Sequence, residues 1–264
     1  MNWLAHRTLT STVLVVGSAL AQVPKRFDVA TIKPYAVFDG NFMIRPQPGG
    51  KFSAVGVTLK MLVMWAYNVK AFQILGAPRW EGTDLWEIQA QVEGVKGRLP
   101  LEDERGMVRA LIEDRYRMKL HREMRKMPIY ALVALKPNVS KLAAPTASGA
   151  GICPCTPSSL TPARASIAML ANELSTILWR RVIDKTGIAG EYAFKLEWTK
   201  APGEYGPEAL GLPLGLGEEA SLTTAYKGPS IFTALKEQLG LRLEPQKGLV
   251  EVLVIDDVEK PSAN

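Results

Sequence analysis

The same order of secondary-structure patterns occurs twice along this chain of 264 residues. Residues 57–135 and 165–256 each predict a helix, a strand, a second helix and two closing strands, which together form an α-β-α-β-β unit. The two openings are alike, since residues 57–62 read VTLKML and residues 165–170 read ASIAML. The repeat indicates an old duplication, and it leaves open whether the units form two small domains or share one sheet.

In the first unit, Thr58 can cap a helix that is apolar around nearly its whole circumference, so we expect this helix to be buried on most sides. Residues 85–92 (LWEIQAQV) alternate as in a half-buried strand. Residues 101–115 predict the second helix, with acidic residues at its N-terminal end. Residues 117–123 and 128–135 predict two separate closing strands.

The second unit follows the same order. After a helix that begins near residue 166, residues 191–198 (EYAFKLEW) predict a strand and residues 230–239 predict a helix. Residues 241–244 and 249–255 predict the two closing strands.

Strands are also expected ahead of the first unit. Residues 26–32 alternate between apolar and polar side chains, and residues 41–45 and 51–55 flank the Pro/Gly-rich run 46–50. The complete pattern predicts an α+β fold. Two related α-β-α-β-β units would pack as small mixed sheets with helices on one face, preceded by an N-terminal β-hairpin region.

Composition divides the chain further. The N-terminal unit with its leading strands spans residues 22–135, and the C-terminal unit spans residues 165–264. Residues 136–164 are rich in Ala, Pro, Ser and Thr and predict a linker, and residues 201–228 are rich in Gly, Pro and Leu and predict a long insertion. With 47% apolar residues over this length, the chain can bury a core without help, so no cofactor is expected.

Residues 1–21 have the pattern of a secretory signal peptide. Arg7 supplies the positive start, residues 9–20 form the apolar stretch, and Ala19-Leu20-Ala21 fits a cleavage site, so the mature chain would begin at Gln22. The apolar stretch is shorter than the roughly 20 residues that span a bilayer. We therefore expect a periplasmic or secreted protein with no transmembrane segment after cleavage.

The net charge of +6 favours anionic partners. Outside the cytoplasm such a protein meets anionic lipid or cell-wall polymer before nucleic acid, so a nucleic-acid partner is not expected. Six cations gather in one short stretch in which Glu123 is the only acid: Arg115, Arg117, Lys119, Arg122, Arg125 and Lys126. This basic cluster is a candidate anion- or partner-binding surface, and the alternative is a solvated strand face that protects a sheet edge.

Reactive side chains are scarce. The chain has two histidines, of which His6 lies in the signal segment, and two cysteines, and these cannot form a closed zinc site, so no metal is expected. The chain has no G-x-S-x-G, S-x-x-K or G-x-x-x-x-G-K-[ST] motif, which argues against three large enzyme classes. His121 shares a strand face with Arg117 and Lys119, so we expect it among exposed cations rather than in a triad. No catalytic residue is assigned.

Cys153 and Cys155 flank Pro154 within the predicted linker. In an oxidising compartment the two thiols can close a tight local disulfide, form a redox pair or bind a soft metal. A loop this short adds little stability, and we expect a surface turn whose thiols become oxidised.

A short run resembles the phosphorylated-aspartate motif of P-type ATPases, and it consists of Asp184, Lys185, Thr186 and Gly187. Such pumps need many membrane helices, so we interpret the run as a turn. Gly187 and Gly190 would supply positive φ, while Asp184 and Thr186 would bond the local backbone. Asp184 and Glu191 are the acids on which a hydrolase would depend, but nothing in the sequence places two carboxylates across a cleft.

Several stretches occur in the order and spacing of one family: residues 27–34 (FDVATIKP), 59–62 (LKML), 66–67 (AY), 183–187 (IDKTG), 190–192 (GEY), 234–241 (ALKEQLGL), 252–256 (VLVID) and 259–261 (EKP). On these residues the chain resembles the soil-associated family of unknown function that is abundant in Acidobacteria. That family has no established activity and implies no catalytic residue, and Cys153 and Cys155 lie outside its pattern. Similar domains attached to membrane metallopeptidases of the antibiotic-sensor type imply extracytoplasmic sensing.

By pattern, each unit also resembles the short N-terminal domains at the periplasmic ends of secretins and TonB-dependent receptors, which bind partners through sheet edges. Because the sequence shows strands and helices but no convergent nucleophile, base or metal set, we expect an exported envelope protein that acts as a non-catalytic binding or interaction module. Its partner would be an envelope protein or a cell-wall or lipid polyanion, and residues 127–135 and 249–255 are candidate docking strands. Two alternatives stay open: an envelope hydrolase with acidic catalytic residues, and a polyanion-binding protein that uses the basic cluster.

Overall fold

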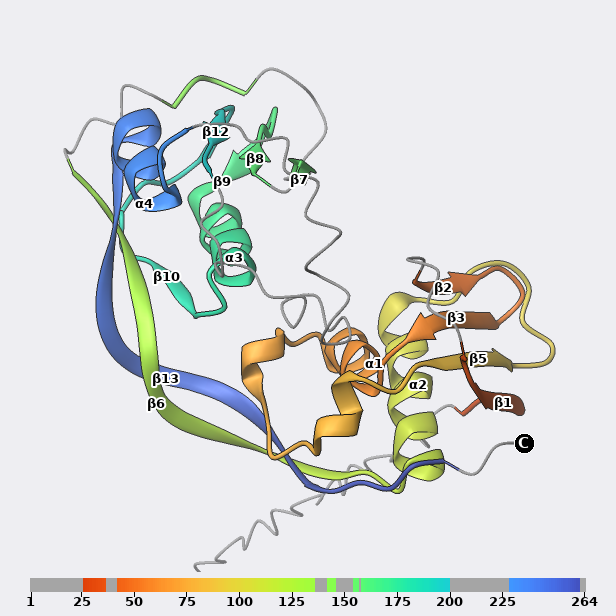
Figure 1. Ribbon diagram of the computed structural model, residues 1–264. Coiled ribbons are helices and arrows are strands. Elements are labelled where there is room, and N and C mark those ends of the chain that lie inside the picture. The colour runs from red at the N-terminus through yellow and green to blue at the C-terminus, as the bar shows by residue number, and fades with distance from the viewer. Residues whose placement is uncertain are drawn as a thin grey trace, which may run out of the picture.

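The computed structural model describes residues 26–36, 42–135, 142–145, 154–156, 158–199 and 228–261. Two bodies of helices and short strands lie along a long two-stranded ribbon (Figure 1). In chain order the elements are β1 (Val29–Pro34), β2 (Met43–Gln47), β3 (Lys51–Val57), α1 (Leu59–Tyr67), η1 (Ala71–Gln73), β4 (Ile74–Leu75), η2 (Arg79–Gly82), β5 (Trp86–Gln91), α2 (Leu101–Arg115), β6 (Lys119–Ala134), β7 (Pro154–Thr156), β8 (Ser159–Leu160), β9 (Ala165–Ser166), α3 (Ile167–Ile177), β10 (Val182–Asp184), β11 (Glu191–Tyr192), β12 (Leu196–Glu197), α4 (Ile231–Ala234), η4 (Leu235–Leu239) and β13 (Leu241–Asp257).

The first sheet has the strand order β1-β5-β3-β2, and every neighbouring pair is antiparallel. The hairpin expected around residues 46–50 joins β2 to β3. Helices α1 and α2 pack on one face of this sheet, where alternate residues such as Phe52, Trp86 and Ile88 are buried. In β5, where buried and less buried residues alternate, the period-2 pattern therefore marks the inner face, as it does for a sheet covered on one side.

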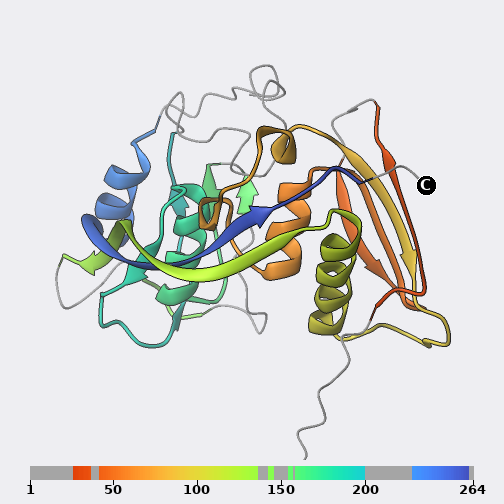
Figure 2. The same cartoon turned by 90° about the horizontal axis from the view of Figure 1, so that it is seen from below.

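The second sheet has the order β10-β6-β13-β4 and belongs to both bodies. Its centre is the antiparallel ribbon of β6 and β13, which runs from one body to the other (Figure 2). The predicted α+β fold with small sheets is confirmed. The ribbon also answers the question that the repeat left open, because the two halves of the chain share one sheet.

The sequence pattern was wrong about the closing strands, because each predicted pair forms one continuous strand. The ladder runs without a break through Pro128, which faces Lys247, and through Pro245, which faces Tyr130. A proline lacks a backbone N–H and is accommodated in a strand only where that donor is not needed, as at an outer edge. The middle of β6 and of β13 contains charged residues and a proline, so its sequence indicates a break although the strand is continuous.

The two halves are interlocked by exchanged short strands. In the first half, β4 pairs in parallel with β13 of the second half, and Ile74 faces Leu253. In the second half, β10 pairs in parallel with β6 of the first half, and Val182 faces Tyr130. These short strands cover part of both candidate docking strands, residues 127–135 and 249–255.

The exchanged strands obey an approximate two-fold relationship. Thr58 and Ser166 are equivalent positions of the two halves, because each caps a helix and accepts a backbone N–H at 3.2 Å. Ile74 and Val182 are separated along the chain by the same number of residues as these caps, so β4 and β10 are equivalent as well. Leu249 aligns with Lys126 in the repeat and is also its cross-strand partner. The approximate axis therefore passes between these two residues, as it must where a residue faces its own counterpart.

Three clusters of buried apolar side chains support this arrangement. The first lies between the β1-β5-β3-β2 sheet, α1 and α2, and the second lies around α3, α4 and the short strands of the second half. The third is small and sits on the ribbon between them, where Ile129, Val250 and Val252 pack with Phe72 of η1 and Ile183 of β10. Side chains from both halves therefore meet at the middle of the ribbon.

The predicted linker, residues 136–164, contributes structure where it is described. Strands β7 and β8 form a small sheet with β12, and Ala143 pairs with Ala193. The predicted signal segment and most of the predicted insertion, residues 201–228, lie outside the described residues. Among the helices that are described, none combines the length and the apolar character needed to cross a bilayer.

Candidate ligand-binding site

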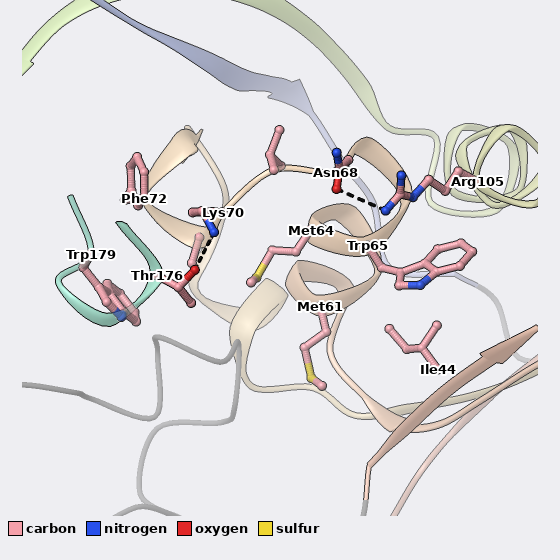
Figure 3. Close-up of a pocket in the computed structure, with 12 residues that line it drawn as sticks. Ile44, Met61, Met64, Trp65, Asn68, Lys70, Phe72, Arg105, Thr176 and Trp179 are labelled. Carbon is pink, nitrogen blue, oxygen red and sulfur yellow. Dashed lines mark hydrogen bonds between the residues drawn. The ribbon is translucent and has the colours of Figure 1, made fainter. Parts of the chain in front are cut away.

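A pocket of about 350 Å³ lies where the two halves meet (Figure 3). Most of its wall comes from the first half, through β2, α1, η1 and α2, and the rest comes from α3 and the turn that follows it. Its lining residues are mainly apolar or aromatic: Ile44, Met61, Met64, Trp65, Asn68, Val69, Lys70, Ala71, Phe72, Arg105, Thr176 and Trp179. The volume is at the lower end of the range for small-molecule sites.

Helix α1 positions one wall of the pocket. It begins at a cap in which Thr58 accepts the N–H of Met61, and it ends where Asn68 adopts the left-handed conformation with φ 53°. Left-handed residues commonly terminate helices, and asparagine tolerates this conformation better than most residues. The chain therefore turns sharply after one short helix and brings Lys70 and η1 to the pocket.

The apolar character of α1 around its circumference has two causes. One face packs into the first core through Leu62, Val63 and Ala66. Another face lines the pocket through Met61, Met64 and Trp65, which lie three and four positions apart, on one side of a helix. The second face is apolar although it borders a cavity, so its composition serves the cavity as well as the core.

Lys70 is held at the junction by contacts with both halves. Its backbone N–H donates to Gln73 Oε1 at 3.0 Å, and the Gln73 side chain donates to the backbone oxygen of Glu251 in β13 at 2.9 Å. Its ammonium donates to Thr176 Oγ1 on α3. Burial lowers the pKa of Lys70, the nearby Glu173 carboxylate opposes this effect, and Arg181 adds to it.

Trp179 forms the opposite wall in an uncommon backbone conformation. Its φ is 51°, in the left-handed region that large side chains rarely adopt. Such a conformation costs on the order of 1–3 kcal/mol, and it persists only where surrounding structure holds it. The strained turn directs a half-buried indole at the junction between the halves.

A second hollow of about 210 Å³ adjoins the first and shares Phe72 and Trp179 with it. Its floor is the ribbon, and its rim carries Arg180 and Arg181. Arg180 lies over the ring of Tyr130, 4.8 Å from the centroid, which is a cation–π geometry. The side chains of Phe72 and Trp179 therefore lie between the first hollow, which is lined by methionines, and the second hollow, which carries the two arginines.

The charged side chains among the described lining residues of both hollows are positive. Among the residues that the structure describes, neither lining includes an aspartate or a glutamate. Arg105 donates to Glu102 at 2.6 Å and to Asn68 at 3.1 Å, and its Nε is buried without a hydrogen-bond partner in the described structure. The pocket thus combines an apolar interior with cationic groups.

The basic cluster predicted from the sequence lies elsewhere, from the C-terminal end of α2 along the first half of β6 to the middle of the ribbon. Most of its cations have acidic neighbours, several from β13 and the residues after it. The pairs are Arg115 with Asp114, Arg117 with Glu259, Lys119 with Asp257, Arg122 with Glu251, and Arg125 with Glu123. Lys126 is exposed at the middle of the ribbon. Pairing reduces the net positive field that a polyanion would meet.

The run from Asp184 to Gly187 forms a tight turn at the end of β10. Asp184 Oδ1 accepts from the backbone N–H of Thr186 at 2.9 Å and from its hydroxyl at 2.7 Å, and Gly187 has φ 69°. Lys185 donates to Gln246 Oε1 at 3.0 Å. Glu191 pairs with Arg164, and neither Asp184 nor Glu191 lines either hollow.

The remaining predicted groups do not converge. Cys153 lies outside the described residues, and Cys155 belongs to β7. His121 Nδ1 lies 2.9 Å from Asp256 on the exposed ribbon. Within the described ranges, no group of three or more His, Cys, Asp or Glu residues is arranged to hold a metal ion.

No local sequence pattern marks the residues that line the pocket as a site. A partial signal is the apolar circumference of α1, which predicted only that this helix is buried on most sides. Lys70, Thr176 and Trp179 carry no local motif, because they meet only after the two halves interlock.

The fold and the pocket define a class: an α+β protein of two interlocked halves with a ligand-sized cavity at their junction. Residues 60–258 match the family described as "Protein of unknown function (DUF3738)". Because this match spans most of the chain, the protein belongs to that family. No curated protein and no solved structure matches the chain.

Proposed function

We propose that this protein is an exported binding module that holds a small, largely apolar ligand in the pocket between its halves. The observation that carries the proposal is the cavity of about 350 Å³ lined by methionine and aromatic side chains. Apolar cavities with a few polar groups are the usual form of small-molecule sites. Methionine adapts to irregular shapes and contacts aromatic rings favourably, which suits such a site.

Export is the second part of the proposal, and it rests on the signal-peptide pattern of residues 1–21. The likeness to a family abundant in Acidobacteria and to periplasmic secretin domains favours the same compartment. Sequencing the N-terminus of protein recovered from the periplasm or medium tests this part. We expect Gln22 as the first residue, and retention of the intact chain in the cytoplasm would contradict export.

The binding part is tested by calorimetry on the mature chain, with 2-naphthylmethanol as an uncharged apolar probe. Met64→Trp places a larger ring in the pocket, and Met169→Trp makes the same change on α3, away from both hollows. We expect wild type and Met169→Trp to bind the probe equally and Met64→Trp to bind at least ten times more weakly. Absence of binding to wild type, or equal binding by all three proteins, would contradict the proposal.

A further inference from the structure

We infer that the ligand is an amphipathic organic anion, whose apolar body lies among the methionine and aromatic side chains and whose single anionic group lies at Lys70. This inference rests on the proposed function and adds the chemical class of the ligand. A carboxylate on a ring-sized or short acyl body is the simplest molecule of this kind.

The first support is charge complementarity. The described residues that line the two hollows include Lys70, Arg105, Arg180 and Arg181, and none of them is acidic. Arg105 already has an acidic partner in Glu102 and also donates to Asn68, although its Nε has no hydrogen-bond partner in the described structure. Glu173 influences Lys70 electrostatically, but no ion pair joins them in the described part of the chain. Of the two cations in the wall of the first pocket, Lys70 is therefore the one without an acidic partner among the described residues.

The second support is the hydrogen-bonding capacity of Lys70. An ammonium carries three N–H donors, and the described structure assigns one of them, to Thr176 Oγ1. The side chain is partly removed from water, and this burial disfavours its charged form. An anion beside Lys70 would accept its remaining donors and compensate for the lost hydration.

The third support is the arrangement of the rings around this cation. Trp179 and Phe72 flank Lys70 on one side, and Met64 lies on the other (Figure 3). The left-handed backbone of Trp179 is strained, and strain of this kind tends to occur at ligand-binding positions. A flat apolar body can therefore pack against the indole while its charged group remains near Lys70.

The test compares three probes that share one ring system: 2-naphthoate, 2-naphthylmethanol and 2-naphthylmethylammonium, titrated by calorimetry into the mature protein in low-salt buffer at neutral pH. We expect naphthoate to bind at least ten times more tightly than the alcohol, and the ammonium probe to bind most weakly. Equal affinity for the anion and the alcohol would overturn the inference and leave the proposed function standing. Failure of all three probes to bind would overturn both.

Substitution of Lys70 provides the second arm. Lys70→Met keeps the length of the side chain and removes its charge, so naphthoate should lose at least tenfold in affinity while the alcohol changes by less than twofold. Lys70→Arg should keep the preference for the anion and shows that the position tolerates replacement. Lys236→Met, at an exposed position of η4, removes the same charge outside the pocket and should leave both affinities unchanged. An undiminished preference for the anion in Lys70→Met would overturn the assignment.

Discussion

Lys70, just beyond helix α1 of the first half, donates a hydrogen bond from its ammonium to the hydroxyl oxygen of Thr176, on α3 of the second half. The two residues are far apart in the sequence, and their contact lies in the wall of the pocket. The contact therefore joins the halves at the site where we place the ligand.

Replacing Thr176 with valine removes this acceptor at nearly constant volume. Hydrogen bonds to charged groups contribute about 1.5–3 kcal/mol when buried. Because Lys70 is only half-buried, we expect a loss of about 1 kcal/mol in the free energy of unfolding, measured by urea denaturation. In a double-mutant cycle with Lys70→Met, the two losses should not add. Fully additive losses would show that the contact contributes nothing to stability.

The exchanged strand β4 can be tested through Gly76. Its φ is 79°, and a Cβ there would lie 2.5 Å from the backbone oxygen of Ile255 in β13. Gly94 is the matched control, since its φ is 72° and a Cβ there would meet no atom within 4 Å. Both alanine variants incur the strain of the left-handed region, on the order of 1 kcal/mol. Only Gly76→Ala adds a clash with the ribbon.

We therefore expect Gly94→Ala to lower the free energy of unfolding by about 1 kcal/mol and Gly76→Ala to lower it by clearly more, about 3 kcal/mol or above. Thermal and urea unfolding of both variants provide the comparison. If the two variants are equally stable, β4 does not pack against β13 as described.

The buried carboxyl of Glu81 should make the free energy of unfolding depend on pH. Burial raises the pKa of this carboxyl from 4.5 to about 7, and Lys60 acts in the opposite direction. Its Oε2 is buried without a hydrogen-bond partner in the described structure. Because the folded state holds this proton more tightly than the unfolded state, the contribution of Glu81 to stability is greatest below pH 4.5, falls as the pH rises to 7, and is constant above.

The loss across this window is at most about 3 kcal/mol for a shift of this size. Glu81→Gln cannot ionise, so its unfolding free energy relative to wild type should increase between pH 4.5 and 7.5. Glu93→Gln, at an exposed position, controls for the change in net charge. Parallel pH profiles for wild type and Glu81→Gln would mean that Glu81 is not buried in the folded state.

Features that depend on neighbouring residues could be predicted from the sequence. Thr58 caps α1 as expected, and Ser166 caps α3 in the same way, because an N-cap needs only the N–H three residues further on. The hairpin between β2 and β3 follows from a proline- and glycine-rich turn. The predicted order of helix, strand and helix also occurs in both halves, through α1, β5 and α2 and through α3, β12 and α4, although each predicted pair of closing strands is one strand.

Features that depend on distant residues could not be predicted in this way. The ribbon is continuous because β6 and β13 support each other through positions that carry weak strand signals, such as Pro128 opposite Lys247. The exchange of β4 and β10 depends on pairs such as Ile74 with Leu253. The pocket depends in turn on that exchange, since Thr176 reaches Lys70 only once the halves are interlocked.

The most direct test observes the pocket itself, by NMR of methionine methyl groups in the mature protein during titration with 2-naphthoate. An aromatic ring bound beside Met61 and Met64 should shift both methyl signals in a saturable way. Met169 on α3 and the exposed Met124 on the ribbon should stay unchanged. Saturable shifts at Met61 and Met64 alone are the result that we predict. Shifts at Met124 instead, or none at Met61 and Met64, would contradict a ligand site between the halves.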